Sequence, residues 1–279
     1  METSIFRVRE TLQMRILSEL FRHTRRHEII VKGGIGMRVS VNSVRYTKDI
    51  DLDANPLTEA EQTREWVRAS VRTAVFACSS YISNIKITEP KQTDTTLRWK
   101  INGLFADTSE PFQLTVEVSR RGFLARDHII TTTFTPPAEY NLSPIMVEVY
   151  DSKALMVSKI SAMLNDNRDA PRDLYDLGTL FGMGVEPDCK LMKELFQRQK
   201  MGPEEMMDKL WKKLDMFTWE RFGEEVLPYF EKMQASRFNE EYFNSFVLMV
   251  GEKLQELLSR YYSQEEELDE ANSNCPGGM

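Results

Sequence analysis

The residues best suited to chemistry are acids that alternate with apolar residues in one short segment. Asp49, Asp51 and Asp53 alternate with Ile50 and Leu52. Because the side chains of a strand point alternately to its two faces, we expect the carboxylates on one face and the aliphatic residues in the core. Ionised carboxylates at that spacing need a counter-charge. Oxygen ligands of this kind suit Mg²⁺ or Mn²⁺ together with substrate phosphates. The segment predicts a divalent-metal site; an edge strand with solvated acids is the plainer alternative.

A glycine turn precedes these acids. Gly33, Gly34 and Gly36 follow an apolar run at 29–31 that is typical of a buried strand, and residues 37–41 can begin a helix. Small residues at this point let backbone N–H groups approach phosphate oxygens, and a helix N-terminus adds favourable partial charge. The run is neither a dinucleotide fingerprint nor a P-loop, since GxGxxG and GxxxxGK[ST] are absent. Together with the acids, it predicts a phosphate-binding turn.

The order of these motifs resembles the AbiEii nucleotidyltransferase toxins of the DNA polymerase β superfamily. A Gly-Gly pair follows a strand, an arginine stands four residues on, and Arg-Tyr-Thr-Lys-Asp-Ile-Asp comes next; later a helix with a lysine precedes Arg-Asp-Leu-Tyr-Asp-Leu. The matching residues are Gly33, Gly34, Arg38, Arg45, Tyr46, Thr47, Asp49, Asp51, Lys159, Ala162, Arg172, Asp173 and Asp176. One departure is Ile35, which replaces the usual hydroxyl residue and leaves phosphate contacts there to backbone amides. Another is Lys48, which stands where an acid is common.

The resemblance implies transfer of a nucleotide from an NTP, with Mg²⁺ or Mn²⁺ held by Asp49, Asp51 and a third carboxylate on a later strand. Glu117 is the candidate, because residues 114–118 alternate so that it lies opposite their apolar side chains. The expected triphosphate contacts are Gly33, Gly34, Arg38, Arg45 and Lys48. The resemblance also implies an RNA acceptor, with tRNA the leading candidate. It further implies a toxin of a toxin–antitoxin or phage-defence system, and a separate antitoxin protein.

One lysine stands among the apolar residues of a helix expected at 152–165. At about 100° per residue, Lys159 falls inside the apolar arc of that helix. A buried lysine needs a partner, and the resemblance supplies the triphosphate as that anion. On the next helix, at 171–182, Asp173 and Asp176 share one face. The resemblance favours Asp176 as a functional acid that contacts nucleotide, acceptor or Lys159, and Asp173 as a residue that positions Lys159 or an arginine.

The elements around these motifs change character near residue 151. Strands are expected at 29–31, 50–52, 84–87, 96–101, 112–118, 128–134 and 145–149, and helices at 4–27, from Pro56, and at 152–165, 171–182, 188–199, 203–214, 217–235 and 239–262. This order is typical of an α+β fold, and the resemblance implies a polymerase β-like core with a mixed sheet. We expect residues 1–150 to form that core with a basic N-terminal helix, residues 151–262 to form a helical subdomain that completes the nucleotide site, and residues 263–279 to be a disordered acidic tail.

Composition excludes several classes of protein. The chain has 279 residues, of which 41% are hydrophobic and 28% charged, and it lacks the apolar run of about 20 residues needed to cross a bilayer. Cys78, Cys189 and Cys275 are far apart, which fits reduced thiols in a cytoplasmic protein. The net charge of −7 argues against a general nucleic-acid coat. Residues 1–48 nevertheless hold an excess of Lys and Arg, which predicts a basic surface for a polyanion or a solvated helix face.

Two other functions stay open at this stage. Nucleotidyl transfer to a small hydroxylated molecule, such as an aminoglycoside, needs the same acids and the same phosphate-binding turn. A catalytically silent nucleotide-binding or interaction module would keep the scaffold alone; Ile35 points toward it, whereas the presence of every motif carboxylate points away from it.

Overall fold

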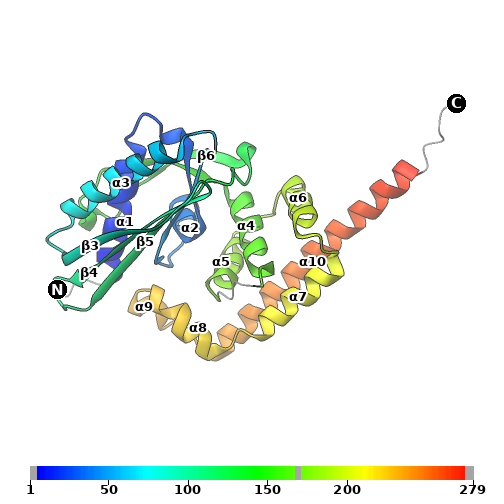
Figure 1. The fold of residues 1–279 in the computed structure, drawn as a ribbon. Helices are drawn as coiled ribbons and strands as arrows, with labels where there is room; N and C mark the ends of the chain where they lie inside the picture. The colour runs from blue at the N-terminus through cyan, green and yellow to red at the C-terminus, as the bar shows by residue number, and fades with distance from the viewer. Residues whose placement is uncertain (1–4, 167–170, 274–279) are drawn as a thin grey trace. The chain divides into compact units, whose positions relative to one another are not determined.

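The chain divides into two compact units, Met1–Leu155 and Met156–Met279. They are seen in a computed structural model that describes residues 5–166 and 171–273 (Figure 1). The first unit contains a sheet of seven strands with three longer helices, and the second is helical. The α+β class expected from the sequence is therefore confirmed.

The first unit begins with a helix and alternates helices with strands. Its elements are α1 (Ile5–Phe21), η1 (Arg26–Glu28), β1 (Ile29–Lys32), α2 (Gly33–Val41), β2 (Ile50–Ala54), α3 (Ala60–Ala77), β3 (Ile82–Gln92), β4 (Thr96–Phe105), β5 (Pro111–Ser119), η2 (Arg126–His128), β6 (Ile129–Phe134), η3 (Ala138–Tyr140) and β7 (Ile145–Tyr150). All seven strands expected from the sequence are present.

The acid-bearing strand lies near the middle of the sheet. The strand order is β3-β4-β5-β2-β1-β7-β6. Strand β2 runs parallel to β5 on one side and antiparallel to β1 on the other. Strand β1 runs parallel to β7, and the remaining neighbours are antiparallel. The sheet is therefore mixed, and its parallel β2–β5 pair joins segments that are far apart in the sequence.

The core of the first unit explains which way the acids face. Ile50 and Leu52 of β2, like Trp99 of β4 and Val116 of β5, are fully buried in one apolar cluster with the inner sides of α1 and α3. Because strand side chains alternate, the residues between them lie on the opposite face of the sheet. Asp51, Arg98 and Glu117 belong to that second, polar face.

The N-terminal helix differs from its sequence-based interpretation. Glu10, Thr11, Gln13 and Ser18 are buried together with its apolar residues, so α1 has no broad solvated basic face. Basic residues of this region are ion-paired: Arg7 with Glu139, Arg22 with Glu19, Arg25 with Glu28, Lys32 with Asp53, and Arg38 with Glu10. Carboxylates of the same unit thus pair with five of the ten Lys and Arg residues at 1–48, which weakens the expected basic surface.

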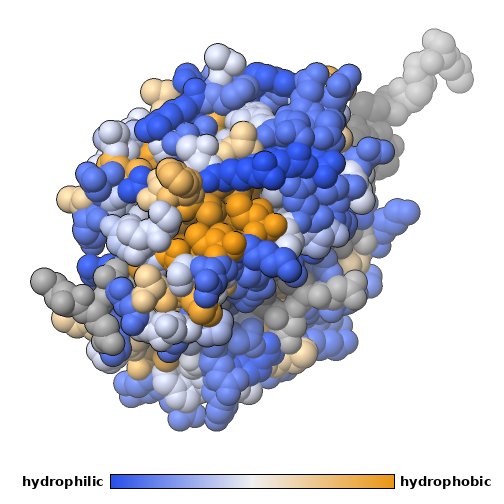
Figure 2. Space-filling model, turned by 60° about the vertical axis from the view of Figure 1, so that its left-hand side comes forward, coloured by the Kyte–Doolittle hydropathy of each residue, from blue (hydrophilic) through white to orange (hydrophobic). Residues whose placement is uncertain are grey.

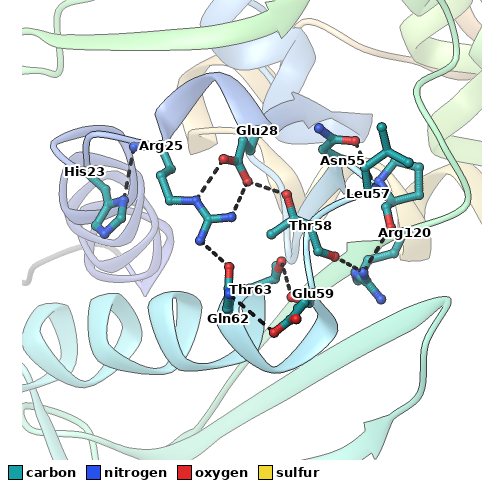
Figure 3. A network of polar contacts seen from close by, with 11 residues as sticks. His23, Arg25, Glu28, Asn55, Leu57, Thr58, Glu59, Gln62, Thr63 and Arg120 are labelled. Atoms are coloured by element: carbon teal, nitrogen blue, oxygen red, sulfur yellow. Dashed lines mark hydrogen bonds and ion pairs between the residues drawn. The ribbon is translucent and has the colours of Figure 1, made fainter.

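A polar network fastens the loop that follows β2 (Figure 3). Arg25 donates two hydrogen bonds of 2.8 Å to the Glu28 carboxylate, which accepts a third, of 2.5 Å, from the Thr58 hydroxyl. The buried Arg120 donates to the carbonyl oxygens of Thr58, Pro56 and Asp94. The loop therefore contacts Glu28, which precedes β1, and Arg120, which follows β5. These contacts hold the C-terminal end of β2 in place.

The second unit is built from helices, with the first turn of α4 contributed by the preceding unit. Its elements are α4 (Ser152–Leu164), α5 (Pro171–Gly182), α6 (Cys189–Gln199), α7 (Pro203–Asp215), α8 (Trp219–Glu225), η4 (Leu227–Tyr229), α9 (Lys232–Ala235) and α10 (Glu240–Ser273). The single helix expected at 217–235 is three short elements, because Pro228 lacks an N–H and cannot continue a helix.

Helix α10 is longer than expected. It continues to Ser273, so residues 263–273 are helical where the sequence favoured a disordered tail; the Glu, Leu and Ala of this stretch are good helix formers. Residues 274–279, including Cys275, lie outside the described residues. None of the described helices combines the length and apolar character that crossing a bilayer requires. The face drawn in Figure 2 is mostly hydrophilic, with a hydrophobic area near its middle.

Candidate functional site

A row of charged residues crosses the polar face of the sheet. Lys32 of β1 is paired in register with Asp51 of β2, Asp51 with Glu117 of β5, and Glu117 with Arg98 of β4. Residues opposed in this way on neighbouring strands lie side by side on one face. The row reads cation, carboxylate, carboxylate, cation. Two of the carboxylates proposed from the sequence, Asp51 and Glu117, are therefore neighbours across the strand pair β2–β5.

The glycine turn packs closely against Asp51 and Thr47. Gly33 begins α2 directly after β1 and has a φ of +64°, which L side chains rarely adopt. A Cβ added there would lie 2.6 Å from Asp51 Oδ2, and one added at Gly34 would lie 2.6 Å from Thr47 Oγ1. Glycine is needed at both positions because these side chains stand against the turn. The helix starts at Gly33, earlier than the expected 37–41, so the Gly-Gly pair itself forms its N-terminus.

The loop between α2 and β2 carries Asp49 and is held by side chains that contact its backbone. Arg38 donates to the Ser43 carbonyl, Arg45 to the Tyr46 carbonyl at 2.9 Å, and Gln13 of α1 to the Thr47 carbonyl at 3.1 Å. Arg45 is buried, and Arg38 also pairs with the buried Glu10 at 2.5 Å. Both arginines expected at the triphosphate thus contact the protein itself. Lys48 and Asp49, at the end of the loop, are half-buried.

The third acid of the motif has partners within the unit. The buried Asp53 accepts a hydrogen bond of 2.8 Å from the Tyr150 hydroxyl and lies 2.5 Å from the ammonium group of Lys32. The Tyr150 oxygen in turn accepts from the Leu124 N–H at 2.8 Å. Burial, reinforced by the Asp53 charge, raises the pKa of Tyr150 well above its usual range, so the phenol stays a donor. Asp53 fixes Lys32, whose ammonium is partly exposed, directly before Gly33.

Glu117 is bound by an arginine. Arg98 donates from Nε at 2.8 Å and from Nη2 at 2.5 Å, both to Glu117 Oε2. Among the described residues, no group of three or more His, Cys, Asp or Glu side chains is gathered as a metal cluster. Asp51 and Glu117 do fit the one or two carboxylates that Mg²⁺ takes beside substrate phosphates.

The second unit contains a buried ion cluster. Lys159 of α4 lies 2.8 Å from Asp173 and 2.6 Å from Asp176, both of α5. Its side chain is 5% exposed, and those of the two aspartates are 3% and 0% exposed. The anion that the apolar surroundings of Lys159 require is thus supplied by two carboxylates of the same unit. Both Asp173 and Asp176 contact the Lys159 ammonium group.

Sequence reasoning missed the cations of the row. Lys32 directly precedes the glycine turn. The alternation of residues around Asp51 does not predict that Lys32 lies beside Asp51, because this contact depends on the register between β1 and β2. Arg98 is likewise brought to Glu117 only by the pairing of β4 with β5. Gln13 lay unnoticed on a helix assigned to the surface. Register between strands is not encoded in the spacing of residues within one strand.

The chain is similar to one described protein family. The family model described as "Nucleotidyl transferase AbiEii toxin, Type IV TA system" matches residues 15–260. No curated protein matches the chain.

Among solved structures, the crystal structure of JHP933 from Helicobacter pylori has a TM-score of 0.57 and 17% sequence identity. The likeness covers 97% of this chain and 99% of that one. A second crystal structure from H. pylori has a TM-score of 0.49 and 16% identity over 93% of this chain and 96% of that one. At such identities, the likeness to JHP933 shows a shared fold alone.

Proposed function

The chain belongs to the AbiEii nucleotidyl transferase toxin family, and from this premise we propose that it transfers a nucleoside monophosphate from an NTP to a hydroxyl of RNA, with tRNA the leading acceptor. The observation that carries the proposal is the β2–β5 register, in which Asp51 and Glu117 are adjacent, together with the close approach of the Gly33 backbone to the Asp51 carboxylate. Nucleotidyl transfer needs a carboxylate pair beside a phosphate-binding turn, and this face of the sheet offers both.

Asp49, Asp51 and Glu117 would hold Mg²⁺ or Mn²⁺. When bound, such an ion stabilises charge on phosphoryl oxygens and orients the reacting groups. Without a bound ion, Arg98 supplies the counter-charge for Glu117, which lies beside the Asp51 carboxylate. Glu117 is also the acid placed to accept a proton from the attacking hydroxyl, since it lies on the half-buried polar face next to Asp51.

The phosphates of the NTP would lie on the backbone N–H groups of Gly33 and Gly34. These amides open α2, where the first N–H groups of a helix have no intrahelical partner and the helix dipole favours anions. Lys32, directly before the glycine turn, and Lys48, shortly before β2, add partly exposed positive charge. Because backbone amides make these contacts, Ile35 costs the site one hydroxyl but leaves the phosphate-binding turn in place.

The arginines and the lysine of the family motifs take supporting roles in this proposal. Arg38 and Arg45 fix the loop that presents Asp49, because they donate to loop carbonyls and, in the case of Arg38, to Glu10. In the second unit, Lys159 joins α4 to α5 through Asp173 and Asp176. The Lys159 ammonium already contacts two buried carboxylates, which favours a structural role over phosphate binding.

The type IV toxin–antitoxin description of the family implies an antitoxin and growth inhibition as the biological outcome. We propose that the antitoxin is a separate protein. The acidic composition of the chain limits general binding to nucleic acids, so the acceptor must be bound by a local surface.

The test is a labelling assay with Mg²⁺, each radiolabelled NTP singly, and total cellular RNA. Label in a tRNA-sized band is expected. Asp51→Ala should lower transfer at least about a hundredfold, whereas Asp107→Ala, which removes an exposed acid from the β4–β5 turn, should leave it unchanged. Label only on added small hydroxylated compounds, such as an aminoglycoside, would replace the RNA acceptor. No label on any acceptor would overturn catalysis and leave a nucleotide-binding module.

A further inference from the structure

Strands β3 and β4 carry a strip of basic residues on the polar face of the sheet. Lys91 of β3 opposes Arg98 of β4, and Thr88 opposes Lys100. Lys86 opposes Asn102 two positions farther along β4. Since opposed residues share a face, Lys86, Lys91, Arg98 and Lys100 lie on the same side as Glu117; we call them the β3–β4 basic strip. It extends from the carboxylate row to the edge strand of the sheet.

The lysines of this strip keep their charge available. Lys86 and Lys91 are exposed and Lys100 is half-buried, and within residues 5–166 and 171–273 none of the three has an ion-pair partner. The nearest acid of β3, Glu89, contacts Arg64 and Arg68 of α3 instead. The strip is therefore a local positive surface on an acidic protein, unlike the paired cations near the N-terminus.

The chemistry of this face selects the kind of contact. The residues that lie between or beside the lysines are Thr88, Asn102, Gln113 and Thr115. None of them has an aromatic ring, so the face offers hydrogen bonds and charge but no platform on which a base can stack. Successive same-face residues of a strand lie about 6.7 Å apart. Arg98 and Lys100 have this spacing on β4, and Lys86 and Lys91 flank them on β3, so the positive charges are distributed over two strands as a nucleic-acid backbone requires.

We infer that the β3–β4 basic strip binds the phosphate backbone of the RNA acceptor and leads its reacting end toward Asp51 and Glu117. The inference rests on the proposed function and names the surface that the acceptor uses. Binding is independent of RNA sequence, because phosphate contacts carry no base information. It depends on salt, because each neutralised phosphate releases counterions. Arg98 is the link between the two parts, since it touches Glu117 and belongs to the strip.

The test compares the full chain with a triple variant, Lys86→Gln, Lys91→Gln and Lys100→Gln. The matched control removes the same charge from exposed lysines of the second unit, Lys190→Gln, Lys212→Gln and Lys232→Gln. The Kd for a fluorescein-labelled tRNA transcript is measured by anisotropy across about 50 to 200 mM salt. In the strip variant we expect binding at least about tenfold weaker and a salt slope lower by about 2, or about 0.7 per lost contact; the control changes neither.

Steady-state transfer separates this inference from the proposed function. The strip variant should raise the KM for RNA and leave the KM for NTP unchanged. If wild-type protein labels RNA and the variant keeps both its KM and its salt slope, the strip is not the acceptor surface. If wild-type protein labels no RNA while the variant still loses tRNA binding, the reaction is wrong and the surface stands. Equal loss in the control, or binding to phosphatidylserine vesicles in place of tRNA, also overturns the inference.

Discussion

Replacing Gly33 by alanine tests whether the turn is shaped around Asp51. The added Cβ would lie 2.6 Å from Asp51 Oδ2 on a backbone with φ of +64°. The left-handed conformation costs an L residue about 1–2 kcal/mol, and the smaller entropy of the unfolded alanine chain offsets about 0.4–1 kcal/mol. Moving the Asp51 side chain off its rotamer adds about 0.5–1.5 kcal/mol. Gly33→Ala should therefore lower the free energy of unfolding by about 0.5–3 kcal/mol.

Gly184 provides the matched control. Its φ is +70°, yet a Cβ there meets nothing within 4 Å, so Gly184→Ala carries the backbone cost without the collision. Urea unfolding at constant m-value gives both changes in free energy. In an Asp51→Gly background, Gly33→Ala should cost no more than Gly184→Ala, because both the carboxylate oxygen at 2.6 Å and the Asp51 Cβ at 3.2 Å are gone. An excess cost that persists in that background, or no excess at all in the wild type, would refute the reasoning.

Three further outcomes follow from the charged contacts. Lys159→Met removes the ammonium group that both buried carboxylates contact and should lower the free energy of unfolding by about 3–5 kcal/mol in urea titrations; an effect below about 1 kcal/mol would contradict the buried cluster. Hydrogen bonds from Arg68 lower the pKa of Glu89 to about 2 from 4.5, so its stabilisation is present above pH 4.5 and is lost as pH falls through about 2; Glu89→Gln should remove that part of the acid dependence in unfolding curves taken over this range. Arg98→Gln frees Glu117 Oε2 from a competing cation and should tighten Mn²⁺ binding in calorimetry by about two- to fivefold, the worth of a partly exposed pair; weaker binding would mean that Arg98 is needed to hold Glu117 in place.

The local elements of this chain could be predicted because their signals are local. Alternation of acids with Ile50 and Leu52 is a strand signal on its own, and the apolar spacing at 171–182 gives α5 with the bounds that the structure has. Where the helix bounds differ from those expected, the cause is also found in the local sequence. Pro228 divides the helix expected at 217–235, and helix-forming residues extend α10 beyond residue 262.

The candidate site was only partly predictable, because it depends on contacts between distant segments. The apolar surroundings of Lys159 correctly indicated a buried cation with an anionic partner, and the resemblance pointed to phosphate; two aspartates of the next helix meet that need. Arg38 and Arg45 were assigned by motif to the triphosphate, yet they contact Glu10 and loop carbonyls. No pattern along the chain places Arg98 at Glu117, since that contact exists only in the β4–β5 register.

The parallel pairing of β2 with β5 also governs when during synthesis the site can form. A nascent chain that has emerged only as far as β2 carries the acids of the motif but has no Glu117 beside them. The Asp53 carboxylate, which contacts Lys32, receives its hydrogen bond from Tyr150 only after β7 has been made. Pairs of parallel strands that are joined through long intervening segments form slowly, because the entropy cost of closing the loop comes before the stabilising contacts between the strands. A chain that ends before β5 therefore lacks the Asp51–Glu117 pair on which the proposed reaction depends.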